Sequence, residues 1–151
     1  MQHVLFVFFL ALTAFLFALV EIQIEGPNGW ASALPTWRFE SSWSRLLFGN
    51  RSITGYHLFF HLFVFSLLHV PYALGALDFS ITIELRILSF GLLFWVLEDF
   101  LWFVCNPDFG LAAFRPERAW WHAPNWWWIM PRDYWLFTPA GIALYVLSWR
   151  I

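Results

Sequence analysis

Six ionisable side chains lie near the ends of long apolar stretches and a seventh, His122, follows in a loop, and each is of a type that can bind a metal or transfer a proton. They are Glu21, Glu25, His57, His61, Glu98, Asp99 and His122. In an up-and-down bundle of membrane helices, all of these ends reach the same face of the bilayer. Because a charged group in lipid is costly, convergent carboxylates and imidazoles indicate a functional site.

Two of these residues, His57 and His61, are four positions apart and therefore share one face of a helix. This spacing suits two imidazoles that bind one metal ion or two adjacent ions. The pair lacks the neighbouring glutamate that zinc proteases use as a base, so it does not predict that class of enzyme. The alternative is that each histidine hydrogen bonds to a backbone carbonyl or caps its helix.

Carboxylates on two other segments complete the predicted site. Glu21 and Glu25 are also four positions apart, at a helix C-terminus, where they repel each other and oppose the helix dipole. A metal ion or a basic side chain would offset this, although solvation in the headgroup zone is the alternative for Glu25. We predict a site for a divalent metal, either zinc or iron or manganese. Its predicted ligands are Glu21, His57, His61 and Glu98.

The remaining residues are assigned to the substrate and to proton transfer. The predicted acid/base residues are Glu98, Asp99 and His122, and the predicted substrate contacts are Arg38, Trp102 and Glu25. Arg38 is chosen because a guanidinium group binds an anionic headgroup or a carboxylate well. Two alternatives remain open. The carboxylates of the third stretch could pair with an arginine at the rim, and His122 could be an interfacial histidine among aromatic side chains.

Apolar side chains dominate the chain, with 61% hydrophobic and only 12% charged residues, whereas a soluble domain has about 25% charged residues. A membrane crossing needs about 20 apolar residues, and its backbone must satisfy its own hydrogen bonds as a helix. We predict an all-α integral membrane protein, a single domain over residues 1–151 with a bundle of about four transmembrane helices. The predicted spans are residues 4–22, 53–77, 79–105 and 133–149.

The first and the fourth apolar stretches lead to different predictions. No basic region precedes the first apolar stretch and no cleavage site of small residues follows it, so we expect a retained helix rather than a signal peptide. The fourth stretch is the shortest, and it either spans the membrane or stays within the interface.

Arginine and tryptophan placement predicts the orientation. The loops after the first and third stretches each contain three arginines, so the positive-inside rule places both in the cytoplasm, next to the inner membrane if the protein is bacterial. Tryptophans concentrate in the same segments, residues 30–50 and 107–132, which we expect to lie in the membrane interface. The spacing of Trp30, Trp37 and Trp43 favours one face of a helix or a broken helix.

Three functions fit these features. We favour metal-dependent catalysis on a lipid or another hydrophobic substrate. The first alternative is a proton- or cation-coupled transporter that acts as a homo-oligomer, although the outer half of the chain offers few polar groups for a relay. The second is a cofactor-binding or accessory subunit of a larger membrane complex, although histidines four residues apart cannot both be axial ligands of one haem. Without lysine or a basic run, nucleic-acid binding has no support.

Overall fold

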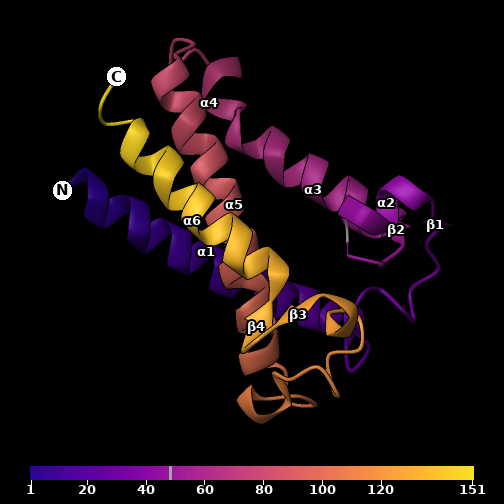
Figure 1. Cartoon of the computed structure of the whole chain (residues 1–151). Coiled ribbons are helices and arrows are strands. Elements are labelled where there is room, and N and C mark those ends of the chain that lie inside the picture. The colour runs from indigo at the N-terminus through magenta and orange to yellow at the C-terminus, as the bar shows by residue number, and fades with distance from the viewer. Residues whose placement is uncertain (48) are drawn as a thin grey trace.

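Three long helices form the body of the molecule. The structure is a computed structural model that describes residues 1–47 and 49–151, and 63% of the chain is helical, which confirms the all-α class. The helices α1 (Gln2–Glu25) and α6 (Arg132–Leu147) each pack along α5 (Ile81–Cys105), as Figure 1 shows. The chain termini lie at the same end of this body.

The contact between α1 and α5 depends on small residues. Leu10, Ala14, Ala18 and Ile22 form a buried stripe along α1, with a spacing of four that keeps them on one helix face. Alanines in such a stripe let two helix backbones approach closely, as is common in membranes. Large aromatic side chains of α5, such as Phe94, fill the space against this stripe. The other face of α1 is apolar and exposed.

The contact between α5 and α6 centres on a glycine. The hydroxyl of Ser89 donates a hydrogen bond of 2.8 Å to the carbonyl of Gly141, and both residues are buried. A Cβ atom at Gly141 would lie 2.7 Å from the Cγ atom of Leu93, which is closer than Cβ contacts normally come. The absence of a side chain at this position therefore sets how closely α6 can approach α5.

The helix α3 (Gly55–Leu68) stands apart from this body. In Figure 1 it diverges from α5 towards its N-terminus and approaches α5 near its C-terminus, next to the short helix α4 (Val70–Ala73). The predicted continuous span over residues 53–77 is therefore shorter and broken. Pro71 lies in the first turn of α4. Its ring would clash with the carbonyl four residues earlier if α3 continued through it.

Two helices of the described chain, α1 with 24 residues and α5 with 25, are long and apolar enough to cross a membrane. The helix α3 has 14 residues and α6 has 16, both fewer than the about 20 that a perpendicular crossing needs. The prediction of about four spans is therefore not confirmed. The structure instead has three helices packed together and a fourth that diverges from them.

The connections contain short strands that the sequence did not predict. After α1, β1 (Arg38–Phe39) pairs antiparallel with β2 (Ile53–Thr54), and α2 (Ser42–Leu47) lies between them. After α5, the 3-10 turns η1 (Leu111–Ala113) and η2 (Ala123–Asn125) lead to a hairpin. In this hairpin β3 (Trp126–Trp127) pairs with β4 (Met130–Pro131).

The tryptophans after α1 do not share one helix face, so that prediction is wrong. Trp30 and the following Ala31 have φ angles of 56° and 51°, in the left-handed region. A right-handed helix cannot continue through two such residues. Trp37 precedes β1, and only Trp43 lies on a helix, α2.

Candidate functional site

A cavity of about 880 Å³ lies between α3 on one side and α5 and α6 on the other. Its ionisable lining comes from the last turns of α1 and α5 and from the first turns of α3 and α6, together with the segments next to them. These residues are Glu21, Glu25, Arg51, His57, His61, Glu98, Asp99, His122, Arg132 and Asp133. The structure thus places all seven of the side chains considered from the sequence in one cavity. It adds two arginines and an aspartate to them.

Three of these residues form a potential metal site. One ligand atom each from Glu21, Glu25 and His57 lies within 4.8 Å of the other two. The two glutamates occupy successive turns of α1, and His57 lies in the first turn of α3. Thr54 caps that turn, accepting a 3.1 Å hydrogen bond from the backbone N–H of His57 and lying 2.6 Å from its Nδ1 atom. Such a partner holds an imidazole ring in the orientation that a metal ligand needs.

The carboxyl groups in this part of the cavity are closely spaced. The Tyr56 hydroxyl donates a 3.2 Å hydrogen bond to Glu21, and the backbone N–H of Ala31 donates one to Glu25. The carboxyl group of Glu21 also contacts that of Glu98. Glu98 is only 3% exposed, and its buried Oε1 atom has no hydrogen-bond partner in the described chain. Two carboxylates this close repel each other unless a proton or a cation lies between them.

Of the four predicted metal ligands, Glu98 lies outside the group of three, and so does His61. Its Nδ1 atom is 2.5 Å from the backbone carbonyl of His57 and must donate there, because a carbonyl only accepts. Its ring stacks on Trp95 of α5 at a centroid distance of 3.9 Å. The structure therefore gives His61 the backbone bond that the alternative interpretation expected. It also leaves the ring at the cavity wall, one turn beyond His57.

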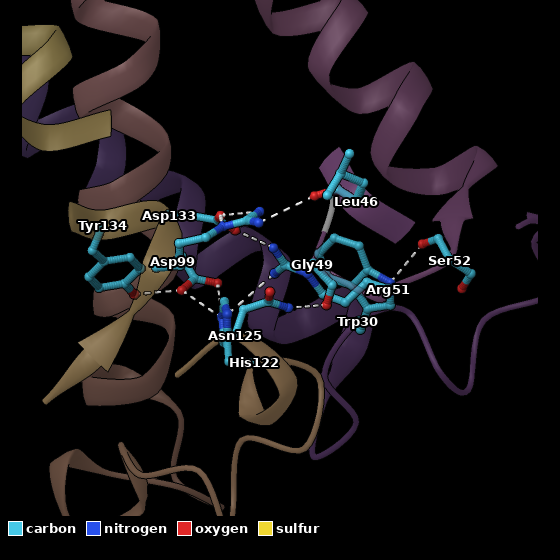
Figure 2. A network of polar contacts seen from close by, with 11 residues as sticks. Trp30, Leu46, Gly49, Arg51, Ser52, Asp99, His122, Asn125, Asp133 and Tyr134 are labelled. Atoms are coloured by element: carbon cyan, nitrogen blue, oxygen red, sulfur yellow. Dashed lines mark hydrogen bonds and ion pairs between the residues drawn. The ribbon is translucent and has the colours of Figure 1, made fainter. Parts of the chain in front are cut away.

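Asp99 and His122 form a second polar group, which Figure 2 shows. The Nε2 atom of His122 lies 3.0 and 3.2 Å from the two oxygens of Asp99, and the Tyr134 hydroxyl donates to Asp99 at 2.5 Å. The other ring nitrogen of His122, Nδ1, lies 3.3 Å from Arg51. A guanidinium group can only donate, so Nδ1 must accept and Nε2 carries the proton. Both ring nitrogens are therefore engaged, and His122 links Arg51 to Asp99.

A chain of ion pairs extends from this group (Figure 2). Arg51 pairs with Asp133, which also pairs with Arg132 at 3.0 Å. The guanidinium carbon of Arg51 lies 4.4 Å from the ring centroid of Trp30, and this indole stacks on the ring of His57 at 4.1 Å. The chain of contacts thus joins the segment that contains β2 to the start of α6. It also reaches the potential metal site.

Two predicted substrate contacts differ in their placement. Arg38 does not line the cavity, because its guanidinium group donates to the carbonyls of Trp30 at 3.4 Å and Ala31 at 2.5 Å. Trp102 does line it, is 3% exposed, and has a buried indole N–H without a partner among the described residues. The third predicted contact, Glu25, belongs instead to the potential metal site with Glu21 and His57.

Sequence reasoning missed several polar lining residues, among them Arg51, Asp133 and Tyr134. Arg51 and Asp133 stand immediately before or at the start of an apolar stretch, and Tyr134 follows at once. Their position at the polar end of a predicted span was the available signal. Nothing in the spacing of Arg51 and Asp133 indicated that they would contact each other, because they are 82 residues apart in the sequence.

Comparisons with protein families, curated proteins and solved structures gave no match for this chain.

Proposed function

We propose that this protein is a membrane metalloenzyme that acts on a lipid or another hydrophobic substrate. The observation that carries the proposal is the group of Glu21, Glu25 and His57, whose ligand atoms lie within 4.8 Å of one another and line a large cavity. Three protein ligands of this kind suit a catalytic zinc ion, since they leave a coordination position open for water or substrate. Carboxylate and imidazole ligands also suit iron or manganese.

The neighbouring side chains supply the other parts of the chemistry. A divalent metal in this position would polarise a substrate oxygen or activate a water molecule. Glu98, which contacts Glu21 and has an unpartnered oxygen, is the proposed acid/base residue. The indole N–H of Trp102 is the proposed hydrogen-bond donor to the substrate. Asp99 and His122 form the second polar group beside it.

The cavity walls support a hydrophobic substrate. Apolar side chains of α3, α5 and α6 line it, including Phe60, Val96 and Phe137. Leu58 of α3 and Leu136 of α6 are both lining residues and exposed, at 40% and 47%, so the apolar lining continues to the outer surface. A lipid could approach between these two helices. We place the site at the cytoplasmic leaflet, with the arginine-rich loops in the cytoplasm.

Elemental analysis of the purified protein tests the metal site. Protein purified in detergent without chelator is expected to hold a stoichiometric divalent metal. The ion should be lost in Glu21→Ala and His57→Ala and retained in His3→Ala, which changes an exposed histidine that contacts Tyr145. Wild-type protein without metal would overturn the proposal. The carboxylates and histidines would then form a proton or ion-pair network, and transport or an accessory role would take its place.

A further inference from the structure

The exposed part of the cavity lining is apolar. Among the described residues, six lining residues are exposed, and five of these are apolar side chains that are between 40% and 75% exposed: Trp43 and Leu46 of α2, Leu58 of α3, and Leu136 and Phe137 of α6. The sixth is His61, whose ring stacks on Trp95. The three glutamates of the cavity are at most 8% exposed. The cavity therefore has an apolar mouth between α2, α3 and α6, and a polar closed end.

In a membrane, this mouth would lie near the level at which lipid headgroups meet the hydrocarbon chains. Leu58 is three residues into α3 and Leu136 is four residues into α6, so each lies about 4–6 Å from the start of its helix at a rise of about 1.5 Å per residue. The adjoining outer faces of the two helices are apolar and exposed, for example at Leu62 and Ile142. A lipid beside these helices can therefore move its headgroup sideways into the cavity while its chain stays in the bilayer.

Two buried polar atoms at the closed end have no hydrogen-bond partner among the described residues. They are the Oε1 atom of Glu98 and the indole N–H of Trp102, and each residue is 3% exposed. Both residues line the cavity, and they stand four positions apart on α5, so they share one face of that helix. An indole N–H only donates, whereas a carboxyl oxygen accepts. A hydroxyl group satisfies both atoms, because it accepts and donates, whereas a quaternary ammonium group or a phosphate dianion satisfies at most one.

The charges at the closed end balance without a charged ligand. The two aspartates and the two arginines of the lining belong to one network, in which His122 links Arg51 to Asp99 (Figure 2). The three glutamates are balanced by the divalent metal of the proposed function, on which this inference rests, together with one proton shared between Glu21 and Glu98, whose carboxyl groups are in contact. A charged headgroup would disturb this balance, since a buried charge needs a partner.

We propose that the substrate is a membrane lipid with an uncharged headgroup that bears a hydroxyl group, as in a monoacylglycerol. The lipid enters the cavity headgroup first. Its hydroxyl group accepts a hydrogen bond from Trp102 and donates one to Glu98, beside the potential metal site. The hydrocarbon chain stays in the mouth and in the bilayer, because burying it against polar groups would leave them without hydrogen-bond partners, which is costly.

Two photoreactive probes test the direction of entry. Both are hexadecanoyl monoacylglycerols, with a diazirine either next to the ester group or at the end of the chain, and they are added to wild-type protein in phosphatidylcholine nanodiscs. After irradiation, the labelled residues are mapped by mass spectrometry. The diazirine next to the ester is expected to label Glu21 and Glu25, and the one at the chain end is expected to label the outer faces of α3 and α6, at Leu62 and Ile142. The reverse pattern, or no label inside the cavity, would overturn the inference.

A blocked mouth tests the route. Leu58→Cys in a Cys105→Ala background carries a bulky maleimide at the mouth, which is expected to reduce the labelling of Glu21 and Glu25 to background. The matched control is Leu62→Cys with the same maleimide, because Leu62 lies one turn further along α3, is also exposed and does not line the cavity. Equal labelling of the cavity in the two variants would rule out entry between α3 and α6.

Competition tests the headgroup. Unlabelled hexadecanoyl monoacylglycerol is expected to displace the probe, whereas hexadecyl phosphate and hexadecyltrimethylammonium at the same mole fraction should displace it poorly. Trp102→Phe keeps an aromatic ring but removes the N–H, so the affinity should fall about two- to tenfold, the usual effect of one lost hydrogen bond. Trp120→Phe is the matched control, at an exposed position outside the lining. Stronger displacement by either charged amphiphile, or equal affinity of the two variants, would overturn the hydroxyl headgroup.

Metal analysis of the same samples separates this inference from the proposed function. Metal-containing protein without label inside the cavity would overturn the inference alone. Metal-free protein that is labelled as expected would overturn the metalloenzyme and would leave the cavity as a binding site for the same lipid.

Discussion

At the scale of single residues, a strained turn orients one of the potential metal ligands. Trp30 and Ala31 adopt left-handed backbone angles, at a cost of order 1–3 kcal/mol for each non-glycine residue. The turn directs the N–H of Ala31 to Glu25 and the carbonyls of both residues to Arg38. Arg38 therefore supports the potential metal site by holding this turn in place, whereas the sequence suggested that it contacts the substrate.

We expect Arg38→Ala to weaken metal binding, although Arg38 does not line the cavity. Loss of the guanidinium group frees the turn, so Glu25 loses its fixed N–H donor and the metal affinity should fall about 10–100-fold, as for other supporting residues. Titration of apo protein with zinc measures this change. The control is Arg45→Ala, because Arg45 forms an exposed pair with Glu40, at 56% and 51% exposure, and should have little effect. Unchanged zinc affinity in Arg38→Ala would contradict the supporting role.

At the scale of helices, the walls of the cavity depend on how closely α6 lies against α5. That approach is set at Gly141, where Ser89 bonds to the carbonyl and Leu93 covers the position of the missing side chain. This close approach fixes the relative positions of the lining residues on the two helices, such as Val96 of α5 and Tyr134 of α6.

Gly141→Ala is expected to destabilise this contact. The added methyl group would lie 2.7 Å from Leu93 and must displace that side chain, which costs about 1–3 kcal/mol in a packed core. Gly91→Ala is the matched control. It has no atom within 4 Å of the added Cβ, and alanine favours a helix over glycine by about 1 kcal/mol. Thermal unfolding in micelles should show a lower midpoint for Gly141→Ala alone, and equal shifts for the two variants would contradict this explanation.

At the scale of the whole molecule, α3 and the three-helix body form a wedge that is held at both ends (Figure 1). At the narrow end His69 lies 3.3 Å from Glu84 of α5. At the wide end, Arg51 pairs with Asp133, and the Asn125 side chain donates to the carbonyl of Gly49. The cavity therefore owes its width to contacts of the segment before β2 with η2 and with the first turn of α6.

Asp133→Asn is expected to loosen the wide end, because it leaves two largely buried guanidinium groups, at 9% and 16% exposure, without their shared carboxylate. Removing one partner of a buried ion pair costs about 3–5 kcal/mol. Spin labels at the exposed residues Leu62 of α3 and Ile142 of α6, in a Cys105→Ala background, would report a broader and longer distance distribution. The matched control Glu40→Gln changes an exposed carboxylate and should leave the distance distribution as in the wild type. If Asp133→Asn also left the distribution unchanged, contacts other than this ion pair would hold the wedge.

The sequence by itself determined the helical class and the positions of the polar groups along their helices, because helix rise and apolar length set how far along a helix each residue lies. It also determined that Glu21 and Glu25 share a face, as their spacing requires. On that basis the seven side chains were expected near one end of the bundle, where the structure has them in one cavity.

Only the tertiary structure decided which of these groups meet. The tilt and rotation of α3 bring His57 to the glutamates of α1 and turn His61 towards Trp95. In the left-handed turn after α1, Arg38 donates its hydrogen bonds to backbone carbonyls. The loops before β2 and α6 bring Arg51 to Asp133. Contacts of this kind depend on helix rotation and on backbone turns between distant segments, and neither follows from hydropathy or residue spacing.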